Sequence, residues 1–106
     1  MNWIKIFATE VEARNRIHEG KPQLLVVNGK RICLLLFKGE FHAVQDGCTH
    51  SGASLSQGHL NYLGEIICPL HNYQFDIRSG MECQSRSRDL ETFPVRIDES
   101  GFFIAL

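Results

Sequence analysis

Short runs of β-forming apolar residues, separated by turn signals, dominate the hydrophobic pattern of this chain. The runs that predict strands cover residues 3–7, 23–27, 31–37, 41–44, 65–67, 73–77, 93–97 and 102–106. Asn28-Gly29 lies between the second run and the third, and this dipeptide favours a tight hairpin turn because both central residues adopt a positive φ. Lys38-Gly39-Glu40 makes a second tight turn. The pattern therefore predicts an all-β fold whose central strands form an antiparallel meander.

Polar segments interrupt these runs in three places. Residues 8–21 show no sustained helical stripe, which predicts a loop or one short turn of helix. Residues 45–61 are rich in Gly, Ser and polar residues, and residues 78–91 mix charges of both signs, so both are predicted loops. We expect a single domain over residues 1–106, with a loop-rich insert at about residues 45–76 between strands from both chain ends.

Length and charge narrow the possible functions. The chain has 106 residues, is 43% hydrophobic and carries a formal net charge of −1, so we expect a folded domain that binds neither nucleic acid nor a membrane. The longest apolar run, Ile32 to Phe37, is far shorter than a membrane span. The start of the chain lacks the apolar core of a secretory signal, so we expect a cytoplasmic protein. A chain this short would take its chemistry from a bound metal centre.

Two short motifs inside the insert carry metal-binding side chains. They are Cys48-Thr49-His50 and Cys68-Pro69-Leu70-His71. Two sulfur and two nitrogen ligands suit zinc or an iron–sulfur centre. A zinc finger usually groups its cysteines in one segment and its histidines in another, whereas each motif here holds one of each. Mixed motifs suit a two-iron centre in which each loop contributes one ligand to each iron.

In these motifs the chain resembles the Rieske family. The matching stretches are Cys48-Thr49-His50-Ser51-Gly52-Ala53, Cys68-Pro69-Leu70-His71 and Phe75-Asp76-Ile77-Arg78-Ser79-Gly80, flanked by Phe41-His42-Ala43-Val44 and Pro94-Val95-Arg96-Ile97. The resemblance covers nearly the whole chain. It implies the Rieske fold of iron–sulfur protein domains, with an antiparallel β base and a loop-rich cluster-binding insert.

The resemblance also implies a cofactor and a function. One [2Fe–2S] cluster per chain would be held by Cys48 and Cys68 on the buried iron and by His50 and His71 on the outer iron. The chain would be a soluble one-electron carrier, monomeric and without catalytic activity of its own. Electrons would come from a flavin-dependent NAD(P)H reductase and pass to a terminal oxygenase or a similar acceptor.

Departures from the respiratory and photosynthetic members of the family indicate a soluble Rieske-type ferredoxin. Those members carry a disulfide-forming Cys in each loop, where this chain has Ala53 and Leu70. Tyr73 and Phe75 stand where those members place a Ser and a Tyr hydroxyl near the cluster. Fewer hydroxyl donors predict a reduction potential toward the low end of the range of roughly −150 to +300 mV.

The loops around the motifs depart from the family pattern as well. Asn72 stands where a Gly usually follows the second His, and residues 81–92 lack the Gly-Pro-rich character of the usual covering loop. This segment holds a charged run, which is most simply a solvated loop, with a partner-docking face as the alternative; the run is Arg86, Arg88, Asp89 and Glu91.

Two other functions remain open from the sequence: the small Rieske subunit of an assimilatory nitrite reductase, and a redox-inert structural zinc module. The remaining cysteines and histidines are not predicted ligands. Cys33 lies in an apolar strand and should be buried, whereas Cys83 lies in a polar loop. His42 lies on a strand, His59 is expected at the surface, and His18 carries no signal.

Overall fold

The computed structural model describes residues 2–106; residue 1 of the predicted domain lies outside the described residues. The elements are β1 Trp3–Phe7, α1 Glu10–Arg16, β2 Gln23–Val27, β3 Lys30–Phe37, β4 Glu40–Gln45, the 3-10 turn η1 Leu55–Gln57, β5 His59–Leu60, β6 Glu65–Ile67, β7 Gln74–Asp76, β8 Thr92–Phe93, β9 Val95–Asp98 and β10 Gly101–Ala105. Strands dominate, which confirms the predicted all-β class.

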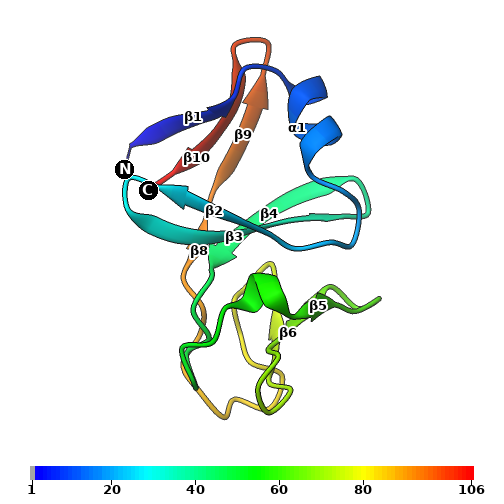
Figure 1. Cartoon of the computed structure of the whole chain (residues 1–106), viewed down its shortest axis with the longest axis vertical. Coiled ribbons are helices and arrows are strands. Elements are labelled where there is room, and N and C mark those ends of the chain that lie inside the picture. The colour runs from blue at the N-terminus through cyan, green and yellow to red at the C-terminus, as the bar shows by residue number, and fades with distance from the viewer. Residues whose placement is uncertain (1) are drawn as a thin grey trace.

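The strands form three antiparallel sheets arranged as a base and an insert (Figure 1). The base consists of one sheet with the order β1-β10-β9 and a second with the order β2-β3-β4-β8, and it contains both the first strand and the last. The insert contains the third sheet, β5-β6-β7. The predicted meander is present as β2-β3-β4, and its first turn has Asn28 at φ 51° and Gly29 at φ 79°.

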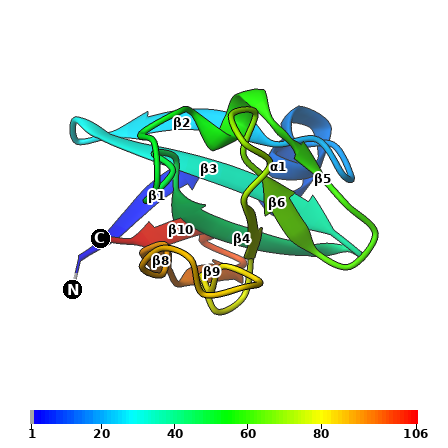
Figure 2. The ribbon, with the colours of Figure 1, turned by 90° about the horizontal axis from the view of Figure 1, so that it is seen from below.

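Strand β3 separates two hydrophobic cores. Six consecutive residues, Ile32 to Phe37, are buried, and alternate side chains enter opposite cores because successive strand residues face opposite sides. The side chains of Ile32, Leu34 and Leu36 pack into the base. Those of Cys33, Leu35 and Phe37 pack into the insert, whose strands β5 and β6 lie in front of the β2-β3-β4 sheet in Figure 2.

A helix replaces most of the first predicted loop. Residues 10–16 form α1, about two turns, so the prediction of a loop or one short turn was too short. Thr9 caps the helix by accepting the Glu12 N–H at 3.0 Å, while Glu12 accepts the Ala8 N–H at 2.9 Å. The Thr-x-x-Glu sequence typical of a capping box was the missed signal, although Glu12 here accepts the N–H of the residue before the cap. No helix in residues 2–106 is long and apolar enough to cross a membrane.

The predicted strand 93–97 is divided at Pro94. β8 pairs with β4 in one base sheet, and β9 pairs with β10 in the other. Proline has no N–H for a continuous ladder, but the Pro94 carbonyl accepts the Ala105 N–H at 3.0 Å. The predicted loop 45–61 likewise contains η1 and the short strand β5.

The base core depends strongly on Phe102. Its ring is fully buried and makes edge contacts with Phe7 at 5.3 Å and Phe41 at 4.9 Å between ring centroids. We expect Phe102→Ala to lower the free energy of unfolding by about 3–5 kcal/mol, measured by urea denaturation. The neighbouring Phe103 is only partly buried, so Phe103→Ala is the control and should cost clearly less. Equal losses would contradict this account of the core.

Candidate metal centre

Two loops bring all four predicted ligand residues together. The first loop follows β4 and carries Cys48 and His50, and the second follows β6 and carries Cys68 and His71. Both thiols are buried, at 4% and 0% exposure, and lie within hydrogen-bonding reach of one another. Both imidazoles are exposed, and their ring centroids lie 5.5 Å apart.

The four side chains form a buried sulfur pair and an exposed nitrogen pair. Within residues 2–106 no three His, Cys, Asp or Glu side chains surround a single ion position. Two separate pairs are the donor set of a dinuclear centre with two thiolates on one iron and two imidazoles on the other. The arrangement thus fits a [2Fe–2S] cluster better than a four-ligand zinc site.

A buried carboxylate organises the first loop. Asp46 is 1% exposed and accepts the Ser54 hydroxyl at 2.5 Å and the Ser56 N–H at 2.9 Å, while Arg31 lies 3.5 Å away. The N–H of Cys48 donates to the carbonyl of residue 53 at 2.9 Å. These bonds hold the ends of the loop together, so Cys48 has a fixed position without regular secondary structure.

The second loop turns sharply through two residues in the left-handed region. His71 has φ 64° and Asn72 has φ 56°, and the Cys68 N–H donates to the Tyr73 carbonyl at 2.8 Å across the turn. Asn is among the residues that tolerate this region best. Asn72 therefore adopts a backbone conformation that glycine would also adopt at this position.

Backbone N–H groups point at both ligand sulfurs. Burial raises the pKa of Cys48, but hydrogen bonds from the N–H groups of Ser51 and His50 outweigh it and leave the pKa below its usual value. Burial raises the pKa of Cys68, and the N–H of Leu70 only partly offsets this. N–H donors aimed at sulfur stabilise thiolate ligands, so the loops suit a metal–thiolate centre.

One hydroxyl near the sulfurs was not anticipated from the sequence. The Ser51 Oγ atom lies 3.7 Å from the Sγ atom of Cys68, and it also accepts the Ala53 N–H at 3.2 Å. The expectation of few hydroxyl donors considered only the second loop, whereas this donor comes from the first.

Residues 81–92, expected to be the covering loop, are held by backbone hydrogen bonds. The N–H of Cys83 donates to Gln74, and the N–H of Leu90 donates to Gly80, each at 2.8 Å. Thr49 of the first loop donates to the Arg88 carbonyl at 2.6 Å. The covering loop therefore packs against the loop that carries Cys48, despite its unusual composition.

Arg86 is exposed, as predicted for the charged run of this loop, but its side chain has fixed partners. Its guanidinium lies 3.9 Å from the centre of the Tyr73 ring and pairs with Glu82, which is 1% exposed. The Tyr73 ring in turn stacks on His50, with centroids 4.0 Å apart. The Glu82 and Arg86 spacing of four residues was the available signal, but in a loop it carries little weight.

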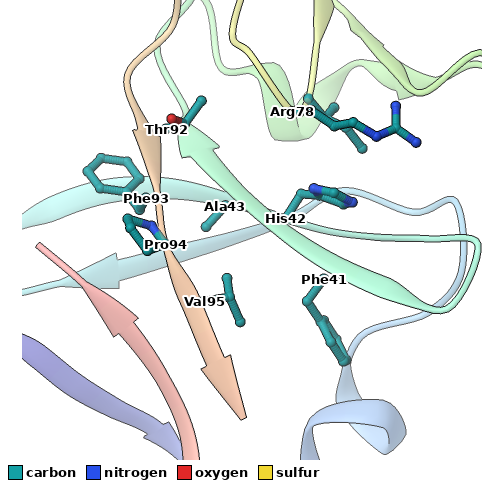
Figure 3. Close-up of a pocket in the computed structure, with 9 residues that line it drawn as sticks. Phe41, His42, Ala43, Arg78, Thr92, Phe93, Pro94 and Val95 are labelled. Atoms are coloured by element: carbon teal, nitrogen blue, oxygen red, sulfur yellow. The ribbon is translucent and has the colours of Figure 1, made fainter.

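His42 lies away from the ligand pairs and lines a groove of about 420 Å³ between β4, the segment after β7 and the chain near Pro94 (Figure 3). Its Nε2 atom is buried and has no hydrogen-bond partner among residues 2–106. Burial lowers the pKa of His42, and the charge of Arg78 lowers it further, against smaller raising effects of Glu40 and Asp76.

The other non-ligand residues match their predictions. Cys33 is fully buried in the insert core, and burial raises the pKa of its thiol. Cys83 is exposed, and both cysteines are free. His59 is exposed as predicted, and His18, for which the sequence predicted nothing, is exposed as well.

A model of the Rieske [2Fe-2S] domain matches residues 7–94. This chain belongs to the Rieske family. Its cofactor is therefore a [2Fe–2S] cluster, and its fold is the Rieske fold.

Similar proteins include the ferredoxin component of the naphthalene 1,2-dioxygenase/salicylate 5-hydroxylase systems of Ralstonia sp. It is 38% identical over 98 residues, which are 92% of this chain and 88% of that protein. A chain from the complex of reduced oxygenase and oxidized ferredoxin in carbazole 1,9a-dioxygenase is 28% identical with a TM-score of 0.81, over 97% of this chain and 92% of that one. The ferredoxin of carbazole 1,9a-dioxygenase from Nocardioides aromaticivorans IC177 shares the fold at 23% identity, with a TM-score of 0.83 over 99% of this chain and 98% of that one.

Removing the Ser51 hydroxyl should lower the reduction potential. A hydrogen bond to a ligand sulfur favours the more negative reduced state, and one such bond is worth about 1 kcal/mol, or roughly a five-fold change in the reduction equilibrium constant. We expect this decrease for Ser51→Ala by protein-film voltammetry. Ser56→Ala is the control, because that hydroxyl contacts Ser54 and not a sulfur. An unchanged potential in Ser51→Ala would exclude this hydrogen bond.

His42 should make stability depend on pH. Its pKa in the folded protein lies below 6.5, so the unfolded chain takes up the proton first as the pH falls. The free energy of unfolding should therefore decrease from about pH 6.5 downwards, and His42→Gln should reduce this decrease in urea titrations. His18→Gln, at an exposed site, is the control. A His42→Gln profile parallel to the wild-type profile would contradict the prediction.

Proposed function

We propose that this protein is a one-electron carrier, the ferredoxin of a multi-component oxygenase system. The observation that carries the proposal is the pairing of two buried thiols with two exposed imidazoles in a chain of the Rieske family. Named relatives are ferredoxin components of dioxygenase systems, and their lengths match that of this chain. A carrier of this kind transfers electrons and catalyses no reaction itself.

Cys48 and Cys68 would hold the inner iron, and His50 and His71 the outer iron. The bound cluster supplies a centre that accepts and releases one electron. The chain's own residues keep the sulfurs away from water and direct N–H groups toward them. The exposed imidazoles place the outer ligands at the protein surface, where a partner can approach them closely.

Two partners follow from this function. A flavin-dependent NAD(P)H reductase would supply electrons, and a terminal oxygenase would receive them. The solved ferredoxin–oxygenase complex similar to this chain supports the second partner. We further propose that residues 1–106 act as one monomeric domain in the cytoplasm, with the cluster-binding insert at about residues 45–76.

The two alternatives have less support. The named relatives belong to dioxygenase systems, which favours an oxygenase ferredoxin over a nitrite reductase subunit. The separation of sulfur and nitrogen ligands into two pairs favours a two-iron centre over a structural zinc site.

The function can be tested on protein expressed with iron supplied. We expect a red-brown protein with two irons and two sulfides per chain. After dithionite reduction it should give a rhombic EPR signal whose average g value lies below that of the free electron. Cys48→Ser should lose the cluster, while Cys33→Ser, at a buried non-ligand thiol, should keep it.

A second measurement separates the functions from one another. Purified oxygenase-system reductase should reduce the protein rapidly, and the reduced protein should support turnover of the partner oxygenase. A colourless protein with one bound zinc after iron-replete expression and reconstitution would refute the proposal.

A further inference from the structure

The covering loop places a cation in line with one of the exposed imidazoles. We propose that Arg86 is a positioning residue of the redox centre, which acts through Tyr73 to hold the ring of His50 in place and to raise the reduction potential. This inference rests on the proposed function, because it takes His50 to be a ligand of the outer iron.

Three side chains form a continuous stack. The rings of His50 and Tyr73 are nearly parallel, with an interplanar angle of 11° and a centroid separation of 4.0 Å. The Cζ atom of Arg86 lies 3.9 Å from the centre of the same Tyr73 ring. Two groups this close to one ring centre cannot occupy the same face, so His50 and Arg86 lie on opposite faces of Tyr73.

The guanidinium is held from outside the stack by a buried carboxylate. Arg86 donates to Glu82 through Nε at 3.1 Å and through a terminal nitrogen at 2.7 Å, a bidentate geometry that fixes the plane of the guanidinium. Glu82 is 1% exposed and also accepts the N–H groups of Gln84 and Arg86. The Arg86 side chain holds the pKa of Glu82 at about 2, so this carboxylate stays ionised at neutral pH.

This support distinguishes Arg86 from an ordinary surface arginine. An exposed ion pair contributes little because both side chains lose conformational freedom when they meet. Here one partner is buried and held by backbone donors, so the cation is already ordered. The carboxylate binds Nε and a terminal nitrogen of the guanidinium, while the Cζ atom lies over the Tyr73 ring.

Two effects on the centre follow. The stack covers one face of the His50 ring and would limit its rotation about a bond to the iron. The guanidinium is the part of the Arg86–Glu82 ion pair that contacts the stack, and a positive charge held there stabilises the state with one more electron. Loss of Arg86 would also leave the Glu82 carboxylate without its cation, which disfavours the added electron further.

The test compares three variants at matched cluster content. Arg86→Gln should lower the reduction equilibrium constant three- to ten-fold by protein-film voltammetry, where ten-fold corresponds to 59 mV for one electron. Arg88→Gln removes the same charge from the same loop, but no contact of the Arg88 side chain with the stack is present among the described residues, so its effect should stay below two-fold. Tyr73→Leu keeps both charges and should shift the EPR g values and speed cluster loss.

A further variant keeps the test decisive if the single variant fails to fold or to hold the cluster. If Arg86→Gln loses the cluster, the double variant Arg86→Gln/Glu82→Gln removes the unpaired buried charge and should retain the cluster with a lowered potential. Equal shifts in Arg86→Gln and Arg88→Gln, or a wild-type potential in a fully loaded Arg86 variant, would overturn the inference. A wild-type protein without the Rieske spectrum would instead refute the proposed function.

Discussion

The two-sided burial of β3 is the constraint on which the rest of the structure depends. A strand whose consecutive side chains are all buried needs a hydrophobic layer on each face. The base sheets with α1 provide one layer, and the insert provides the other. The insert is therefore more than a loop attached to a sheet, because its own core packs on one face of β3 while the base core packs on the other. The ligand-bearing loops are anchored to β3 through this second core, which includes Cys48 and Cys68.

In the loops around the metal centre, buried carboxylates hold the backbone in place by hydrogen bonds, as regular secondary structure does elsewhere in the molecule. Asp46 and Glu82 are both 1% exposed. Asp46 accepts one backbone N–H and one serine hydroxyl of the loop around it, and Glu82 accepts the N–H groups of Gln84 and Arg86. Loops have many N–H groups without ladder partners, and an ionised carboxylate can satisfy several of them at once. One carboxylate shapes the loop that carries Cys48, and the other shapes the loop that covers the centre.

Much of the fold and of the candidate site could be predicted from the sequence because both depend on local patterns. The β-rich runs and the Asn28-Gly29 turn predict the central meander, and the spacing of the two Cys/His motifs predicts which side chains meet. What was missed depends on tertiary contacts. The break at Pro94 is needed because β8 and β9 join different sheets, and the fixed position of Arg86 arises from a buried partner and an aromatic ring on another loop. The helix α1 is an exception, since its capping box is local and was overlooked.

The chain ends meet in the base, far along the molecule from the ligand loops (Figure 1). Asn2 and Leu106 exchange two backbone hydrogen bonds, at 3.1 and 2.9 Å, so the ends lie as close as paired neighbours in a sheet. A short peptide could join them and new ends could be opened elsewhere, giving a circular permutant. The same geometry means that a tether at either end, to an electrode or to a fused reductase, would leave the imidazole-bearing surface free to face outwards.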